Sequence, residues 1–291
     1  EDERTIEPAR KAELLDELLR CLDDPARAAA FPSLVPPLAG DAGHARLVAH
    51  SPHVFTLLRA LPPRTRAHVA RWVTEMVRGM RAFVLRYPDG IRIQTLDEFR
   101  EYCYYVAGTV GYMLTDLWHE HSPAIGRARY ATLRAHCQAF GQGLQTVNIL
   151  KDVAQDAAGE NSIYLPEQEL RRHGSSHATI LSPAHLRQNH AAVAELVELA
   201  WRDLDEAATY LLALPRRAVR IRLFCVFPLL FAYATLRDLT RTTAMLTPAG
   251  APKITRREVR RLLWSGALLV MSNRGVRWLV EQARRGTFAP A

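Results

Sequence analysis

The sequence predicts an all-α protein, on three observations. Apolar residues recur at the three- and four-residue spacing of a helix face through most of the 291 residues. The strict alternation of apolar and polar residues that is typical of half-buried strands is almost absent. Turns containing proline and glycine separate the periodic segments. Apolar residues make up 48% of the chain and no low-complexity linker divides it, so we expect one domain over residues 1–291 with a substantial core.

The turns divide the chain into seven expected helices. The first follows the acidic start of the chain, and the second begins at Pro63, because proline suits the first turn of a helix. The turn at 89–90 ends the second helix, the connection around 166–176 precedes the fifth, Pro215 separates the fifth from the sixth, and the turn at 247–250 precedes the last. The expected helices span residues 7–22, 63–87, 96–119, 125–157, 184–214, 217–240 and 255 to the tail.

No signal for membrane insertion or secretion is found. The longest apolar candidate, Leu223–Leu236, is shorter than the about eighteen residues that a membrane span needs. The charged start of the chain lacks the basic and then apolar layout of a signal peptide. We therefore expect a cytoplasmic protein. The tail at 274–285 mixes basic residues with Val276 and Trp278, which fits either an interfacial helix at the inner face of the membrane or an ordinary packed helix.

The composition points to an anionic ligand without choosing among ligands. A formal net charge of +8 and a pI near 9.6 suit nucleic acid, a phospholipid surface or a phosphorylated substrate. Nucleic-acid binding has no support other than this charge, so we do not expect it. Four isolated cysteines in apolar contexts show no spacing for zinc or for a redox pair and are expected in the core. They are Cys21, Cys103, Cys137 and Cys225.

The most informative segment is 145–156, where polar residues recur at helical steps of three and four. Residues at this spacing share one helix face, while the apolar residues between them suit burial. A hard cation such as Mg²⁺ takes oxygen ligands from a few carboxylates and completes its shell with water and phosphate oxygens. An aspartate pair one turn apart fits this requirement, although such a pair is often only a solvated helix face. The polar residues of this face are Gln145, Asn148, Asp152 and Asp156.

A second segment, 102–112, combines aromatic and small residues within a predicted helix. Glycine inside a helix costs on the order of 1 kcal/mol relative to alanine, so it usually has a packing or ligand reason. Ala107 and Gly111, one turn apart, leave a shallow groove that either a neighbouring helix or a long apolar ligand could fill. The acidic start Glu1-Asp2-Glu3 suits a helix N-terminus by charge, and from the residues alone it has no metal role.

In this order, these segments resemble the signatures of the squalene/phytoene synthase family of head-to-head prenyltransferases. Residues 1–6 are similar to the end of the family's first aspartate-rich signature, and residues 102–111 to its Tyr-Cys-x-Tyr-Val-Ala-Gly-x-Val-Gly signature. Residues 145–156, followed by Ile163-Tyr164-Leu165-Pro166, are similar to the second aspartate-rich signature. The resemblance implies an isoprenoid-synthase-type helical bundle around a central apolar cavity.

Two later segments favour squalene synthases, and bacterial ones in particular, within that family. The helix that contains Phe224-Cys225-Val-Phe-Pro228 is similar to their Phe-Cys-x-x-Pro helix. Lys253-Ile254-Thr-Arg256 is similar to their Lys-Ile-x-Arg segment, which is implicated in binding the nicotinamide cofactor. Two differences stand against the family pattern. Roughly seventy N-terminal residues of a family member would precede residue 1, and the arginine expected just before the Tyr-Leu-Pro run is replaced by the sequence 159–162.

The resemblance also assigns roles to individual residues. It implies that Asp2, Asn148, Asp152 and Asp156 hold Mg²⁺, with Mn²⁺ as a substitute, and that the three aspartates and Tyr102 are catalytic. It implies NADPH contacts for Lys253 and Arg256. The residues expected to bind the two prenyl diphosphates are Gln145, Asn148, Lys151, Tyr105, Ala107, Val110, Gly111 and Phe224.

The expected activity is the condensation of two farnesyl diphosphates, through presqualene diphosphate, to squalene, with release of diphosphate and reduction by NADPH. Formation of dehydrosqualene or phytoene without NADPH is an alternative. A family member without turnover, acting as an assembly or binding factor, is another. The sequence leaves the oligomeric state open.

Overall fold

The computed structural model describes residues 5–38, 42–251, 253–286 and 288, and throughout these ranges the regular structure is helical. The prediction of an all-α fold is confirmed. The α-helices are α1 (Pro8–Cys21), α2 (Pro25–Leu34), α3 (Ala42–Ala60), α4 (Pro63–Arg86), α5 (Leu96–Cys103), α6 (Thr109–His121), α7 (Arg127–Gln155), α8 (Glu167–Arg172), α9 (Leu186–Ala213), α10 (Val219–Leu239), α11 (Arg256–Leu269) and α12 (Asn273–Arg285).

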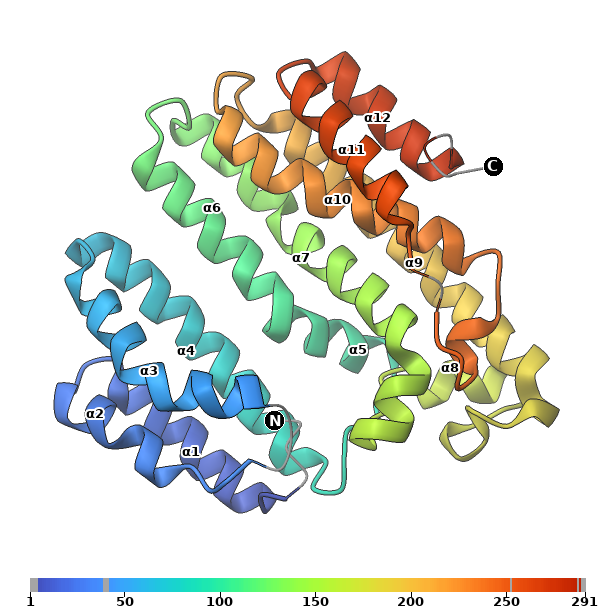
Figure 1. Ribbon diagram of the computed structural model, residues 1–291, viewed down its shortest axis with the longest axis horizontal. Helices are drawn as coiled ribbons and strands as arrows, with labels where there is room; N and C mark the ends of the chain where they lie inside the picture. The colour runs from blue at the N-terminus through green and yellow to red at the C-terminus, as the bar shows by residue number, and fades with distance from the viewer. Residues whose placement is uncertain (1–4, 39–41, 252, 287, 289–291) are drawn as a thin grey trace.

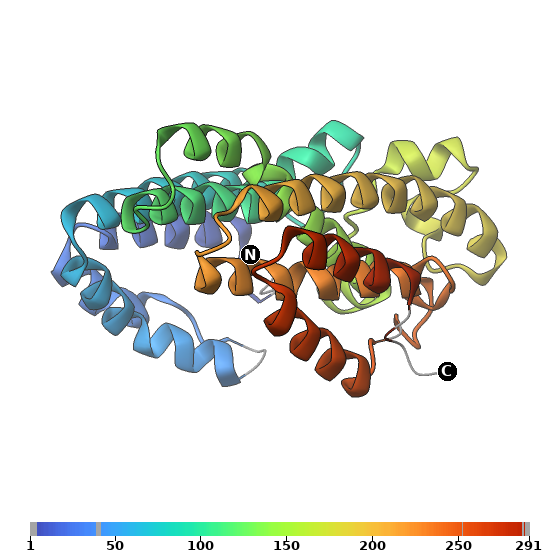
Figure 2. The same cartoon turned by 90° about the horizontal axis from the view of Figure 1, so that it is seen from above.

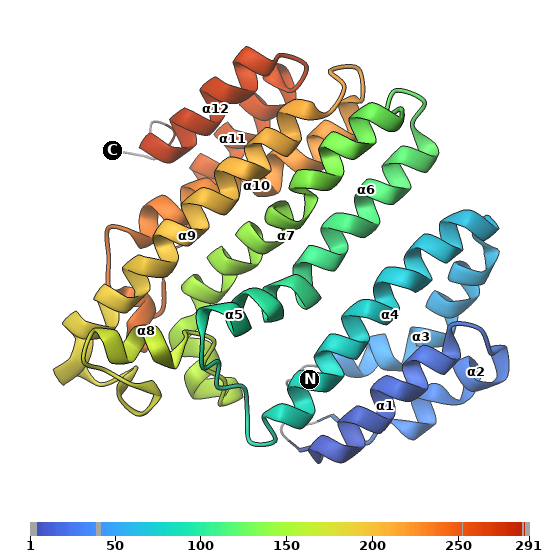
Figure 3. The same cartoon turned by 180° about the vertical axis from the view of Figure 1, so that it is seen from behind.

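Helix α7 occupies the middle of the bundle. It packs along α9 and against α6 and α10, and α4 lies on the far side of α6. Viewed from behind, α4, α6, α7 and α9 run side by side (Figure 3). Helices α1 to α3 gather beside α4 at one end of this row, and α10 to α12 cover the other end (Figure 1). The main core surrounds α7, α9 and α10, and a smaller apolar cluster lies among α1 to α4.

Most predicted helices appear with ends within a few residues of the expected ones, and the differences have local causes. The predicted helix at 96–119 contains a π-helical turn, Tyr104–Gly108, between α5 and α6. The predicted tail helix is divided into α11 and α12, because the Ser272 side chain caps a new helix by accepting a hydrogen bond from Gly275 N–H. Helices α2, α3 and α8 were not predicted. The first two carry an internal proline each, Pro32 and Pro52, and α8 is only six residues long.

The four cysteines are buried and unpaired, as predicted for core residues. Burial raises the pKa of the Cys103 thiol to about 12 and that of Cys137 to about 11. Both therefore stay protonated at neutral pH.

Helix α10 bears on the question of a membrane span. It extends over Val219–Leu239, and by length and composition it is the one described helix that could cross a membrane, whereas the sequence suggested a shorter apolar stretch. Half of its most apolar window is buried, and the helix packs against α7, α9, α11 and α12. A buried core helix of a globular protein has the same composition.

Two glycines allow α7 to approach the α5–α6 segment closely. A β-carbon added at Gly111 would overlap the carbonyl oxygen of Cys137, and one added at Gly141 would overlap that of Ala107. The two backbones are therefore in direct contact at two points, at Gly111 of α6 and at Gly141 of α7.

We expect Gly111→Ala to destabilise the protein by about 1–3 kcal/mol, because α6 and α7 must separate to admit the methyl group. Thermal unfolding followed by circular dichroism measures the change. The matched control is Gly126→Ala, at a position with no atom within 4 Å of the added carbon. A Gly111→Ala melting temperature equal to that of the control would contradict the predicted overlap.

Candidate functional site

The polar residues of α7 lie on one accessible face, as predicted. Asn148 is exposed, and Gln145, Asp152 and Asp156 are half-buried. The opposite face is buried in the core through Val147, Ile149, Leu150 and Val153. Packing on the apolar side therefore fixes the rotation of the helix and presents both carboxylates on the other side.

Lys151 lies beside this polar face and pairs with its neighbour. Its Nζ atom is 3.1 Å from Asp152 Oδ2, and the two side chains are 32% and 33% exposed. A pair this exposed contributes little to stability. It places an ammonium group and a carboxylate within reach of the same ligand.

The chain reverses direction directly after the second aspartate. Residues Asp156–Glu160 form a π-helical turn, which ends at Asn161 in the left-handed conformation with φ of 53°. Ser162 N–H donates to the Asp156 carbonyl at 3.0 Å. Non-glycine residues seldom adopt positive φ, and π-helical turns are frequent at functional sites.

Arg92 stabilises this reversal. Its guanidinium donates to the Asn161 side-chain oxygen at 2.6 Å, to the Asn161 carbonyl, and to the Ile91 carbonyl at 2.8 Å. Gly90, with φ of 114°, lies so close that a β-carbon there would overlap the Asn161 carbonyl. Sequence reasoning missed Arg92 and Asn161, because their partners are some seventy residues apart in the chain.

The segment that returns after Asp156 packs against Tyr102 of α5 at the same end of α7. Ile163 N–H donates to the Ile91 carbonyl at 2.8 Å, and Ile93 N–H donates to the Ile163 carbonyl at 3.2 Å. The next residue, Tyr164, packs its ring 4.9 Å from that of Tyr102, which also contacts Phe83 edge-on at 5.2 Å. Tyr102 is buried.

A cleft beside this reversal joins three separate parts of the chain. It is lined by the start of α1 from Ile6 to Lys11, by residues 87–91, and by residues 160–162 that follow Asp156. Residues near the start of the described chain and the turn that follows Asp156 therefore line the same cleft. Asp2, predicted as a metal ligand and catalytic residue, lies outside the described residues.

The predicted apolar lining divides between two environments. Ala107 and Gly111 contact the backbone of α7, so a neighbouring helix fills the groove between them at these two points. Tyr105 packs over Gly79 of α4, and Val110 is half-buried. Phe224 on α10 is exposed and contacts Trp118 of α6 edge-on, with ring centroids 5.9 Å apart.

The two residues predicted to bind nicotinamide, Lys253 and Arg256, are both exposed. They lie before α11 and at its first residue, where the Thr255 side chain caps the helix by accepting from Glu258 N–H at 3.1 Å. Both belong to the segment that leads into α11, a helix that packs against α10 and α12 (Figure 1).

Two ion-pair groups that the sequence analysis did not single out support the site. Arg100 of α5 donates to both carboxylate oxygens of the buried Asp203 on α9, and one of these bonds measures 3.0 Å. Its carbonyl accepts from Gln142 of α7 at 3.0 Å. Burial, although opposed by Arg100, raises the pKa of Asp203. These contacts hold α5 with α7 and α9.

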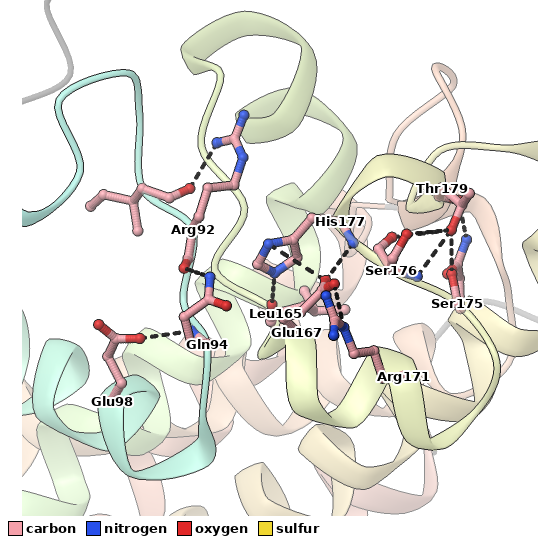
Figure 4. A network of polar contacts seen from close by, with 12 residues as sticks. Arg92, Gln94, Glu98, Leu165, Glu167, Arg171, Ser175, Ser176, His177 and Thr179 are labelled. Carbon is pink, nitrogen blue, oxygen red and sulfur yellow. Dashed lines mark hydrogen bonds and ion pairs between the residues drawn. The ribbon is translucent and has the colours of Figure 1, made fainter.

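The second group follows the returning segment (Figure 4). Glu167 accepts from His177 N–H at 2.6 Å and from Arg171 Nε at 2.8 Å, while His177 Nε2 lies 2.8 Å from the Leu165 carbonyl. Burial alone would raise the pKa of the Glu167 carboxyl, but its hydrogen bonds with Arg171 and His177 N–H hold that pKa below its usual value. Burial lowers the pKa of the His177 imidazole.

Comparisons with known proteins agree with this architecture. The sequence model of the family described as squalene/phytoene synthase matches residues 1–260. Phytoene synthase 3, chloroplastic, of Zea mays is 41% identical over 107 residues, which are 37% of this chain and 24% of that protein. Squalene synthase of Schizosaccharomyces pombe is 28% identical over 153 residues, which are 53% of this chain and 32% of that protein. The aligned segments thus span about a quarter to a third of these two relatives.

Solved structures with a similar fold include two squalene synthases. The complex of TcSQS with the ligand BPH1237 aligns with a TM-score of 0.71 at 19% identity, covering 98% of this chain and 92% of that chain. Squalene synthase HpnC from Alicyclobacillus acidocaldarius aligns with a TM-score of 0.51 at 18% identity, covering 77% and 84%. At these identities the likeness concerns the fold.

The His177 group predicts a loss of stability in mild acid. A histidine whose pKa is lowered by folding stabilises the fold above its unfolded pKa of about 6.5, and this contribution falls as the pH drops through that value. We expect the melting temperature to fall from about pH 7.5 to about pH 5.5, and to fall less in His177→Gln. His44→Gln, at an exposed position on α3, should show the same fall of melting temperature with pH as the wild type. Equal slopes in all three proteins would contradict the assignment.

Proposed function

Because this chain belongs to the squalene/phytoene synthase family, we propose that it condenses two prenyl diphosphates head to head and releases diphosphate. The observation that carries the proposal is the polar face at the end of α7, where Asp152 and, just after the helix, Asp156 stand one turn apart opposite a buried face. Tyr102 lies at the same end, beneath the segment that returns from Asp156.

The donor set on α7 fits Mg²⁺. Mg²⁺ is usually bound through one or two carboxylates, with water and substrate phosphate oxygens completing the shell. Asp152 and Asp156 supply the carboxylates and Asn148 an amide oxygen, all from one accessible face. Within the described residues no three histidine, cysteine or acidic side chains gather in a metal-binding group, so the substrate diphosphate would contribute to the shell. When bound, Mg²⁺ would neutralise negative charge on the diphosphate.

In the proposed reaction, the C–O bond of one allylic diphosphate breaks and the bonding electrons leave with diphosphate. The double bond of the second chain attacks the allylic cation and loses a proton, which gives a cyclopropylcarbinyl diphosphate. Lys151, half-buried and paired with Asp152, would donate to the departing oxygens. Such contacts favour the reaction because charge on these oxygens grows in the transition state.

The other residues protect the cation. Tyr102 can hydrogen-bond to diphosphate while its ring faces positive charge. The aromatic rings of Trp118 and Phe224, in contact between α6 and α10, offer an apolar surface to the prenyl chains. Keeping water from these surfaces prevents premature hydrolysis of the cation.

For the second step we favour breakage of the remaining C–O bond, with loss of diphosphate, and transfer of a hydride from NADPH to the rearranged cation to give squalene, with farnesyl diphosphate as the starting substrate. The support is the similarity of the Phe224 helix and of residues 253–256 to squalene synthases, and the exposure of Lys253 and Arg256, which suits binding of an anionic nucleotide. Phytoene or dehydrosqualene formation is the second candidate, favoured by the 41% identity to a phytoene synthase over 107 residues.

Replacing Asp152 by asparagine tests the polar face. We expect Asp152→Asn to lower turnover about 100-fold or more, because one carboxylate of the proposed Mg²⁺ set is lost. The melting temperature should change little, since the side chain is one-third exposed and, within the described part of the chain, forms an ion pair with Lys151 alone. The control is Glu195→Gln, an exposed carboxylate on α9. Unfolding of Asp152→Asn, or its full activity, would contradict the assignment.

Product analysis tests the second step. With farnesyl diphosphate and Mg²⁺ we expect squalene when NADPH is present, and removal of Mg²⁺ by EDTA should abolish the reaction. A product that does not depend on NADPH would favour dehydrosqualene or phytoene formation. No turnover of either farnesyl or geranylgeranyl diphosphate would favour a binding factor.

A further inference from the structure

The outer face of α11 exposes large apolar side chains beside arginines. Trp264 is 72% exposed and Leu268 is 78% exposed, and Met271 just beyond the helix is also exposed. Arg257 and Arg260 precede them on the same side, since residues 257, 260, 264 and 268 follow helical steps of three and four. We call this set of residues, with Arg261, the α11 face.

Buried contacts on the opposite side fix the rotation of α11. Glu258 and Arg237 of α10 form an ion pair of 2.7 Å in which both side chains are almost fully buried. Leu262 is fully buried, and a β-carbon added at Gly266 would lie 2.9 Å from the Phe227 ring of α10. Turning Trp264 inward would break the Arg237–Glu258 pair and leave two buried charges unpaired, which is costly. The exposure of the α11 face is therefore built into the packing.

The charge of this face is entirely positive. Four arginines, at positions 256, 257, 260 and 261, lie in the first two turns, and the one acidic residue of α11, Glu258, is turned into the core. Arg257, Arg260 and Arg261 line a shallow hollow together with Trp264, Ser265 and Phe288. Phe288 contacts Trp278 of α12 edge-on at 5.9 Å, so the aromatic surface continues from α11 onto the next helix.

We propose that the α11 face docks on the surface of an anionic lipid bilayer. Arginines attract anionic headgroups, while the exposed tryptophan and leucine on the same helix face enter the boundary between headgroups and acyl chains. Figure 2 shows α11 at the lower edge of the molecule in that view, next to α12.

Two other occupants fit less well. In a twofold dimer through this face, the arginines of one copy would meet those of the other, and this repulsion opposes association. A soluble nucleotide would use the arginines but would leave Trp264 and Leu268 in water. The membrane contact is independent of the proposed diphosphate site, because the α11 face shares no residue with the polar face of α7; Arg256, proposed to bind NADPH, is outside the set tested below.

Co-sedimentation with lipid vesicles tests the docking. The purified protein is mixed, without substrate or Mg²⁺, with vesicles of phosphatidylcholine alone or with about 30% phosphatidylglycerol. We expect at least about tenfold stronger binding to the anionic vesicles, weakened by about 0.5 M salt. Asp152→Asn should bind like the wild type. Equal binding to both vesicles, or binding to neither, would overturn the proposal.

Variants assign the binding to the α11 face. Trp264→Ala/Leu268→Ala and, separately, Arg257→Glu/Arg260→Glu should each weaken anionic vesicle binding at least about fivefold. The matched control is Leu85→Ala on α4, a leucine that is 46% exposed beside Arg86, whose charge is paired with Glu98. Wild-type binding by both double variants would overturn the proposal.

Tryptophan fluorescence of the wild-type protein tests the same contact without relying on a variant that could misfold. Bromine-labelled anionic lipids should quench the tryptophan fluorescence of the wild type, and Trp264→Phe should lose most of this quenching. Quenching that is unchanged in Trp264→Phe would count against the α11 face. Gel filtration of the same proteins identifies the competing outcome. A wild-type dimer that Trp264→Ala converts to a monomer would make a second copy the occupant and overturn the membrane proposal.

Discussion

The arrangement depends first on the direct backbone contact between α7 and the α5–α6 segment. With Gly111 on one helix and Gly141 on the other, no side chain separates the two at these levels. The helices pack closely enough for the α5 end of the segment to reach the returning chain, where Tyr102 meets Tyr164. Larger residues at either glycine would displace α6 and, with it, the tyrosine relative to the aspartates of α7.

Buried guanidinium groups maintain the helices that surround α7. Arg222 of α10 is fully buried and, within the described residues, has no carboxylate partner; it donates to the carbonyls of Leu211, Leu214 and Val270. These carbonyls lie at the C-terminal ends of α9 and α11, where the helix dipoles are negative and the carbonyls lack helical partners. One side chain therefore ties three helices together. Burial lowers the pKa of Arg222, which agrees with the cost of placing a charge there.

The two sides of the molecule expose charges of opposite sign. At the end of α7, half-buried carboxylates remain accessible because the apolar side of the helix carries the packing. On α11, the acidic residue is buried with Arg237 and the arginines remain outside. In the two proposals, prenyl diphosphates bind at the polar face of α7, and a membrane surface binds at the α11 face. Both follow from an amphipathic helix whose buried contacts fix its orientation.

The sequence by itself determined the helical class, most helix boundaries and the common face of Gln145, Asn148, Asp152 and Asp156, because these follow from local periodicity along a single helix. It also predicted the burial of the four cysteines. Only the tertiary structure decided that the groove at Ala107 and Gly111 receives α7, that Arg92 holds Asn161, and that Trp264 faces outward. Each of these depends on partners far apart in the chain. Periodicity reports which face of a helix is apolar, whereas packing between helices decides what that face meets.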